Sequence, residues 1–155
     1  MHKKNTIKKY SPQPVYEIYA KEADYLFLKN SQIPDSGKGL YTAIIILKNE
    51  RIAIFKGENL TDEEAKKRAS NKKDAYFINM IDGTIMDSAN RKCFAKYAND
   101  AAGFIKTKLK NNAVISLDDK DNVCIVAIKN IKAGEEVFCS YGDAYWKNYK
   151  KHSIQ

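Results

Sequence analysis

The segment Ile131-Lys132-Ala133-Gly134-Glu135-Glu136-Val137-Phe138-Cys139-Ser140-Tyr141-Gly142 decides the fold of this 155-residue chain. Within it, Ala133-Gly134 predicts a turn and residues 135–139 predict the last strand. The six residues from Tyr141 to Trp146 then group two of the ten tyrosines with the only tryptophan. Such a cluster either lines a channel for a cation or an alkylated amine, where each good contact contributes about 0.5–2 kcal/mol, or closes one end of the core.

Short strands separated by polar turns are predicted on the N-terminal side of this segment. The Asp82-Gly83 dipeptide between two apolar runs favours a type I′ hairpin. Thr61 stands three residues before Glu64, which predicts a capping box at the start of a helix. The spacing of apolar residues in 91–102 is compatible with a second helix. The predicted strands cover residues 25–28, 43–47, 52–55, 75–81, 84–86, 113–117, 123–128 and 135–139, with a loop at 30–39. About eight short strands with one or two short helices indicate a mostly-β domain.

The net charge of +8 is concentrated at the two ends of the chain. Residues 1–10 carry four lysines and residues 147–155 carry three, neither end has an acidic residue, and the body between them is left at +1. A nearly neutral body argues against a dedicated nucleic-acid-binding surface. We expect its acidic runs at 62–64, 118–119 and 135–136 to accept a basic peptide, and the lysine-rich ends to make at most weak contacts with nucleic acid.

Cysteine and histidine residues are too few and too far apart in the sequence for a disulfide framework or a metal site. Cys93, Cys124 and Cys139 are isolated, and both histidines, His2 and His152, lie in the terminal arms. We therefore expect neither a disulfide framework nor a metal site, and we expect the cysteines to be small buried apolar residues. The longest apolar run, residues 40–47, is too short to span a membrane, and no apolar segment follows the N-terminal lysines. An intracellular protein is the resulting expectation.

Six short motifs occur in a fixed order along the chain. The Gly37-Lys38-Gly39 loop alone is a tight turn or a place where a ligand approaches the backbone. The order is Lys29 to Ile33 leading to Gly37-Lys38-Gly39-Leu40-Tyr41, then Phe55-Lys56-Gly57-Glu58, Ile85-Met86-Asp87-Ser88, Lys96-Tyr97-Ala98-Asn99-Asp100, Asn111-Asn112-Ala113 and finally residues 131–142. This order resembles the SET-domain family of protein-lysine methyltransferases over residues 24–146. The chain is most similar to the minimal, single-domain members found in viruses and bacteria.

Two departures from the family pattern stand out. Asp100 occupies the place of the usual histidine, and the family's last motif is not followed by the three-cysteine zinc cluster of many members. The resemblance implies a SET-domain (β-clip) fold, mostly β with short helices, in small sheets with a C-terminal pseudoknot. It also implies three parts, namely an N-terminal arm at residues 1–23, the SET domain at 24–146 and a basic tail at 147–155.

The resemblance further implies a cofactor, S-adenosylmethionine, and a set of site residues. Tyr141 is expected to be the catalytic hydroxyl. The cofactor would be held by the backbone of Lys38, Gly39 and Leu40 and by Asn99, Asp100, Tyr141 and Trp146. The channel for the substrate lysine would be lined by Tyr76, Cys139 and Tyr145. Because Cys139 is smaller than the Tyr or Phe that limits methylation in the family, di- or trimethylation is expected.

Methyl transfer needs a neutral amine, although free lysine has a pKa of about 10.4. A neighbouring sulfonium and a desolvating channel both lower that pKa, so no general base is required and alignment supplies most of the rate. The expected substrate is a basic protein tail, such as that of a histone. Two alternatives stay open: a catalytically lapsed SET fold that binds protein or nucleic acid through its basic ends, and a methyltransferase of a ribosomal or translation protein.

Overall fold

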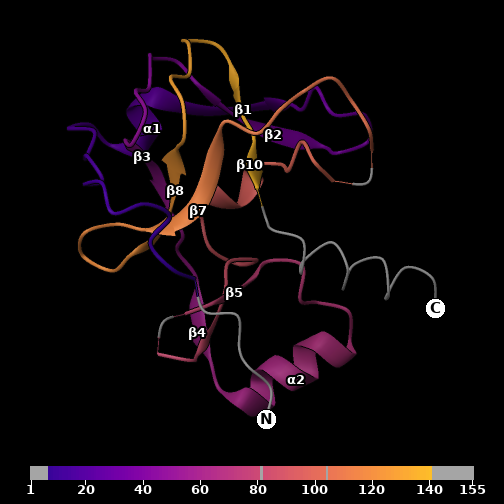
Figure 1. The fold of residues 1–155 in the computed structure, drawn as a ribbon. Coiled ribbons are helices and arrows are strands. Elements are labelled where there is room, and N and C mark those ends of the chain that lie inside the picture. The colour runs from indigo at the N-terminus through magenta and orange to yellow at the C-terminus, as the bar shows by residue number, and fades with distance from the viewer. Residues whose placement is uncertain (1–6, 81, 104, 141–155) are drawn as a thin grey trace.

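The computed structural model describes residues 7–80, 82–103 and 105–140. Three small sheets dominate these residues, and the helical elements are short: α1 (Glu22–Tyr25), α2 (Asp62–Ser70) and the 3-10 turn η1 (Ala95–Tyr97) (Figure 1). The expected fold class, mostly β with short helices, is confirmed. No helix in the described ranges combines the length and the apolar character that a membrane crossing requires.

The strands fall into three sheets. The first has the order β1 (Leu26–Asn30), β2 (Lys38–Thr42) and β9 (Glu136–Val137), all antiparallel. The second has the order β10 (Cys139–Ser140), β7 (Ala113–Leu117), β8 (Val123–Ala127) and β3 (Arg51–Ile54), with β10 parallel to β7. The third has the order β4 (Glu58–Leu60), β6 (Ile85–Asp87) and β5 (Phe77–Asn79), and Figure 1 shows it together with α2 below the other two.

Two local predictions are confirmed. Helix α2 begins with the predicted capping box: Thr61 Oγ1 accepts from Glu64 N, and Glu64 Oε2 accepts from Thr61 N, both at 3.2 Å. Strands β7 and β8 form the predicted hairpin, with Ala113 opposite Ala127 and Leu117 opposite Val123. Each prediction depends on a pattern that spans only neighbouring residues, so the local sequence was sufficient to predict the element.

The hairpin of β5 and β6 forms as predicted, but its turn differs. Met80 N donates to Thr84 O at 2.9 Å, so three residues rather than two separate the paired positions. Gly83 has a φ of +85°, which suits the last position of a three-residue loop. The type I′ turn was therefore the wrong prediction.

The predicted strand at residues 43–47 is wrong. Thr42 Oγ1 accepts from Ile44 N at 3.2 Å and donates to Ile44 O at 2.8 Å, a local turn that ends β2 and prevents the strand from continuing. Ile45 is 62% exposed, and only Ile46 is fully buried, in an isolated bridge to Ile131. The strand begins earlier, at Lys38, inside the region expected to be a loop.

Two further elements are shorter than predicted. Residues 91–102 form only the three-residue turn η1 instead of a helix. The single strand expected at 135–139 is divided at Phe138 into β9 and β10, which belong to different sheets. The chain therefore crosses from the first sheet to the second within five residues.

All three cysteines are buried and free, as expected. Burial raises the pKa of the Cys124 thiol to about 12. Burial also raises the pKa of Cys139, which is fully buried in the main core cluster, well above its ordinary value. Both thiols are therefore protonated at neutral pH, and neither offers a thiolate nucleophile.

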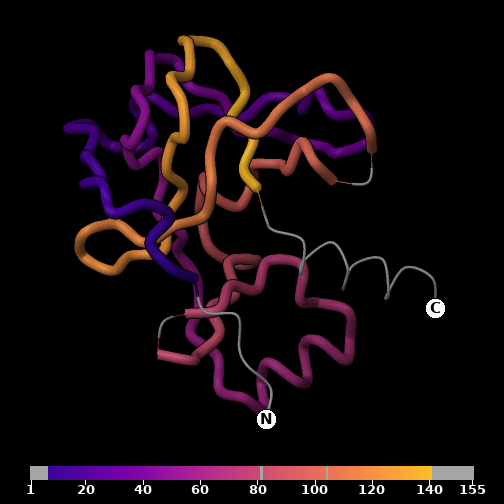
Figure 2. Tube along the Cα trace, in the orientation of Figure 1, coloured from indigo at the N-terminus to yellow at the C-terminus, as the bar shows by residue number. Residues whose placement is uncertain are grey.

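Residues 7–23 of the N-terminal arm lie against the second sheet (Figure 2). Tyr10 N donates to Ser116 Oγ at 2.8 Å, and Lys9 Nζ forms an ion pair with Asp119 Oδ1 at 2.6 Å. Tyr16 bridges to Glu50 immediately before β3. One lysine of the basic arm is thus held within the molecule.

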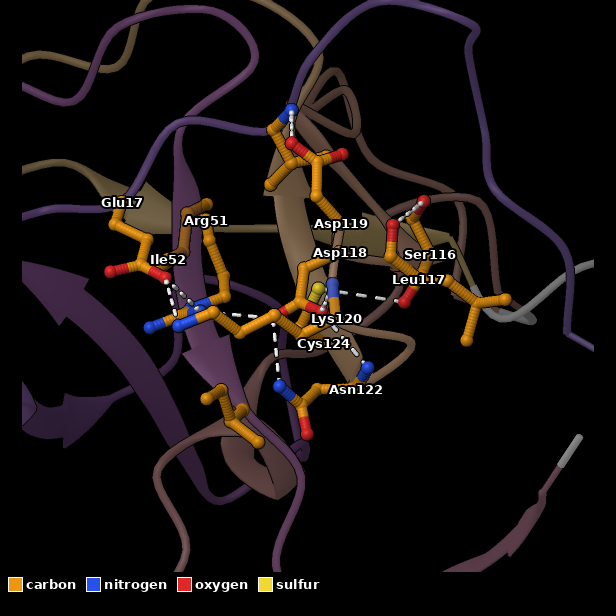
Figure 3. Close-up of polar contacts among 12 residues, drawn as sticks. Glu17, Arg51, Ile52, Ser116, Leu117, Asp118, Asp119, Lys120, Asn122 and Cys124 are labelled. Atoms are coloured by element: carbon orange, nitrogen blue, oxygen red, sulfur yellow. Dashed lines mark hydrogen bonds and ion pairs between the residues drawn. The ribbon is translucent and has the colours of Figure 1, made fainter.

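Of the acidic residues at 118–119 and 135–136 that were expected to accept a basic peptide, Asp118 and Glu136 are buried, and the expectation is wrong for these two. Asp118 is only 4% exposed, and its carboxylate accepts from Arg51 Nη1 at 2.9 Å and from Asn122 N at 2.9 Å (Figure 3). Burial would raise the pKa of Asp118, but hydrogen bonds from Asn122, Lys120 N and Arg51 outweigh it and lower the pKa. Asp119 is exposed and forms an ion pair with Lys9 of the arm.

Candidate functional site

Three distant segments meet at the start of β2. Asn99, just after η1, donates from Nδ2 to Lys38 O at 3.1 Å. Cys139 N in β10 donates to Asn99 O at 2.8 Å, and Asn99 forms a parallel bridge with Phe138. The structure therefore brings together Lys38, Asn99 and Cys139, which the sequence assigned to the cofactor site and the substrate channel. This crossing is the described part of the expected pseudoknot, since Tyr141, Tyr145 and Trp146 lie outside the described residues.

The two glycines of the Gly37-Lys38-Gly39 loop have different roles. Gly37 has a φ of +65°, and no atom lies within 4 Å of the place where a Cβ would stand, so a ligand can approach the backbone there. Gly39 is buried, and a Cβ on it would lie 2.8 Å from Glu136 Cδ and 3.2 Å from Ser31 Cα. Leu40 is completely buried, so its side chain belongs to the core.

Glu136 is a site residue that the sequence reasoning missed, because it was counted as part of a surface patch. It is 1% exposed, and its carboxylate accepts from Ser31 Oγ at 2.6 Å, Gln32 N at 2.8 Å and Tyr41 OH at 3.1 Å. Burial and the charge of Glu136 raise the pKa of Tyr41 to about 12. The carboxylate therefore ties β9 to β2 and to the loop after β1. Alternation along the strand gave no signal for it, because Glu136 and the next residue, Val137, are both buried.

Asn112 fixes the crossing strand from the other side. Its Nδ2 donates to Glu136 O at 2.9 Å, and its Oδ1 accepts from Phe138 N at 2.9 Å. The side chain is 6% exposed. Asn112 thus satisfies one backbone group of β9 and one of Phe138, the residue between β9 and β10.

Asp100, the residue in place of the family's histidine, organises the following loop. It is 7% exposed, and its Oδ1 accepts from Ala102 N and from Asn111 Nδ2, each at 2.8 Å. Asn111 in turn accepts from Ala101 N at 2.8 Å. The carboxylate therefore has a structural use, and its contact with a cofactor stays a prediction.

A second group of residues surrounds the ammonium of Lys96. Its Nζ donates to the carbonyl oxygens of Ser88, Ala89 and Arg91 at 3.1, 3.3 and 2.9 Å. The same atom lies 5.5 Å from the ring centre of Tyr76 and 5.4 Å from that of Tyr97. All three ammonium donors are used, so Lys96 is a fixed positive charge. Tyr76, the predicted channel wall, belongs to this group and is 41% exposed.

Cys139, the other predicted channel residue in the described chain, has no exposed surface and packs in the main core cluster. Whether it limits the number of methyl groups stays a prediction. No group of three or more Asp, Glu, His or Cys side chains that could hold a metal ion is found in the described parts of the chain.

Comparison with known proteins gives matches of sequence and of structure. The model of the SET domain family matches residues 37–142. A curated relative, histone-lysine N-methyltransferase EZH2 of Chaetomium thermophilum, is 29% identical over 140 residues, which is 83% of this chain and 9% of the relative. The chain therefore spans only a small part of that protein's length.

Two solved structures of similar fold are both structures of polycomb repressive complex 2. A humanized mutant of the Chaetomium thermophilum Polycomb Repressive Complex 2, bound to the inhibitor GSK126, matches with a TM-score of 0.63 and 27% identity. An active polycomb repressive complex 2 in the basal state matches with a TM-score of 0.63 and 28% identity. Each match covers 76% of this chain and 15% of the solved chain.

Proposed function

The chain belongs to the SET-domain family, and from this premise we propose that it is a protein-lysine N-methyltransferase that uses S-adenosylmethionine. One observation carries the proposal. The hydrogen bonds from Asn99 to Lys38 and from Cys139 to Asn99 assemble, from three distant segments, the residues that the family resemblance assigns to cofactor and substrate.

The residues present fit the proposed cofactor. Gly37 leaves its backbone open to a ligand, and the Lys38 carbonyl and the Asn99 amide supply polar groups beside it. In the proposed arrangement, the backbone of residues 38–40 and Asn99 hold the cofactor, which supplies an electrophilic methyl group when bound. Asp100 contributes by keeping the loop that follows Asn99 in place.

The chain's own contribution is orientation and desolvation. The acceptor amine has to be neutral, and a fixed positive charge near it disfavours the ammonium form. Lys96 supplies such a charge in the group that contains Tyr76. We assign the orienting hydroxyl to Tyr141, with Tyr76 and Tyr145 as channel walls and Trp146 packed against the cofactor, as the family resemblance implies. Alignment of amine and methyl group then provides most of the acceleration.

We propose a basic protein tail as the substrate. The printed name of the curated relative is that of a histone-lysine methyltransferase, which supports a histone or histone-like target. Asp118 and Glu136 are buried, whereas the other members of the predicted acidic runs are exposed, namely Asp62, Glu63, Glu64, Asp119 and Glu135. Three free, buried cysteines support an intracellular location, where thiols stay reduced.

The test combines cofactor binding with methyl transfer. Titration calorimetry of the full chain with S-adenosylmethionine is expected to show one site, and radiolabelled transfer is expected to modify lysines of histones more than those of ribosomal proteins. Tyr141→Phe should lower transfer at least tenfold, while Tyr19→Phe, at a side chain that is 98% exposed, should not change it. Binding without transfer would indicate a lapsed SET fold, and preferred transfer to ribosomal proteins would overturn the histone assignment.

A further inference from the structure

A cavity lies outside the candidate site, where the N-terminal arm meets β3 and the loop before η1. Its volume is about 420 Å³, and it is partly open to solvent. Its walls come from the segment 18–25, from Arg51 at the start of β3, from Lys56 just beyond the end of β3, and from residues 92–94. Small-molecule sites have volumes of about 300–1,000 Å³, so the cavity is large enough for a small ligand.

The charges around this cavity are mostly positive. Four cationic side chains line it, against one carboxylate, that of Glu22. The cations are Lys21, Arg51, Lys56 and Lys92, which come from three segments far apart in the sequence. The body of the chain is nearly neutral, so its composition alone does not account for four cations around one cavity. Because the potentials of like charges add inside a concave surface, the cavity favours an anion.

Three of the four cations have no carboxylate partner. Lys21, Lys56 and Lys92 are exposed, and none of them takes part in an ion pair within the described parts of the chain. Arg51 differs, because its Nη1 lies 2.9 Å from Asp118 Oδ2 and 3.6 Å from Glu17 Oε1 (Figure 3). The three lysines are therefore the cations that a ligand would meet.

Contacts between the three segments fix the frame of the cavity without a ligand. Tyr25 OH donates to Ile52 O at 2.7 Å, and Glu22 Oε2 accepts from Ile54 N at 3.2 Å, so α1 is joined to β3. Lys56 N donates to Cys93 Sγ at 3.4 Å, which joins the end of β3 to the loop before η1. The lysines thus extend from backbone positions that are already in place, which lowers the ordering cost of binding.

The cavity is separate from the proposed cofactor loop. Ala43 N, directly after the end of β2, donates to Tyr25 O at 2.8 Å, so the cavity lies near this end of β2. Gly37 and Lys38 lie at the opposite end, where β2 begins. An anion in the cavity therefore does not occupy the place proposed for S-adenosylmethionine.

We propose that this cavity binds a small polyphosphate group through the ammonium groups of Lys21, Lys56 and Lys92. A polyphosphate carries several negative charges close together, and a lysine ammonium binds phosphate as a compact point charge. Both a free polyphosphate and a nucleoside triphosphate offer this chemistry. Ile18 and Phe94 are half-buried and form an apolar part of the wall, which a nucleoside would contact. The phosphates of a DNA duplex lie along the outside of a stiff rod, so they fit an enclosed position poorly.

The test is titration calorimetry of the full chain at low ionic strength, with inorganic tripolyphosphate as the probe. One saturable site is expected. Lys21→Gln, Lys56→Gln and Lys92→Gln should each weaken the affinity about fivefold, the value of one partly exposed ion pair. ATP is the second probe, and tighter binding of ATP than of tripolyphosphate would identify a nucleotide as the preferred source of the phosphates. Equal affinities would identify the free polyphosphate, and both results support the site.

Two control variants separate the cavity from a general effect of charge. Lys129→Gln removes the same charge at an exposed lysine that does not line the cavity, and the affinity should stay unchanged. Glu22→Gln removes the one carboxylate of the cavity and keeps an oxygen that can accept from Ile54 N. This variant should bind tripolyphosphate about threefold more tightly, because a like charge beside the anion is removed.

Four results would overturn the inference. They are the absence of saturable binding, equal weakening by Lys129→Gln and the three cavity variants, tighter binding of a short DNA duplex than of tripolyphosphate, and competition between tripolyphosphate and S-adenosylhomocysteine. The last of these would place the anion in the proposed cofactor site. The inference does not rest on methyl transfer, so a protein that binds tripolyphosphate in the cavity but transfers no methyl group would overturn the proposed function alone.

Discussion

A single methyl group added at Gly39 should strain the contact between β2 and β9. The Cβ of Gly39→Ala would stand 2.8 Å from Glu136 Cδ, so the buried carboxylate has to move. Overpacking of this kind costs about 1–3 kcal/mol, and each hydrogen bond that Glu136 loses adds about 1 kcal/mol. We expect a total loss of about 3 kcal/mol in the free energy of unfolding, which lowers Tm by about 10 °C for a chain of this size.

Urea unfolding followed by circular dichroism measures the loss, and two further variants identify its origin. Gly37→Ala adds the same methyl group where no atom lies within 4 Å, so only backbone strain of about 1–2 kcal/mol remains. Glu136→Ala removes the carboxylate with which the new methyl group collides. The double variant Gly39→Ala with Glu136→Ala should therefore be about 2 kcal/mol more stable than the sum of the single losses predicts.

The reasoning is refuted if the two single losses add to within 0.5 kcal/mol, the range found for independent sites. Additivity would mean that Gly39 and Glu136 do not compete for space. A Gly39→Ala variant as stable as wild type would exclude the close contact itself.

Three further variants test other parts of the structure. Asp118→Asn should lower the free energy of unfolding by about 2–3 kcal/mol at pH 7, since the buried partner of Arg51 loses its charge. Hydrogen bonds outweigh burial and lower the pKa of Asp118 in the folded protein. In urea unfolding at several pH values, the difference in stability between wild type and the variant should therefore shrink as the pH falls below the ordinary aspartate pKa of about 4. Asn112→Ala should lose about 3 kcal/mol in urea unfolding, because the buried Phe138 N–H is left without a partner. Thr61→Ala should lose about 1 kcal/mol in a thermal melt through its helix cap, and an unchanged melt would contradict the capping box.

Local sequence signals predicted the elements whose partners are local. The capping box of α2 and the β7–β8 hairpin depend on residues that are near neighbours in the chain, and both formed as predicted. The isoleucine-rich run at 43–47 has high β-propensity, yet it forms no strand, because the Thr42 hydroxyl turns the backbone and β2 instead pairs with the distant β9. Propensity reports the preference of a segment and not the availability of a partner.

The candidate site could be predicted as a set of residues but not as an arrangement. The family motifs identified Lys38 and Asn99, and the structure joins them by a hydrogen bond. Nothing in the pattern distinguished Glu136, which is buried, from Glu135, which is exposed. That difference depends on which face of β9 meets β2, and therefore on a pairing between residues about a hundred positions apart. Tyr141 and its aromatic neighbours lie outside the described residues, so their assignment stays a prediction.

The crossing of the chain at Phe138 also has a consequence for biosynthesis. Both β2 and β7 have an outer partner that comes from residues 136–140, the last described part of the chain. A nascent chain that has not yet released these residues from the ribosome leaves β2 and β7 as edge strands of their sheets, and open edges pair readily with other chains. The same residues that complete the candidate site therefore also end the period in which the newly made chain is most prone to aggregate.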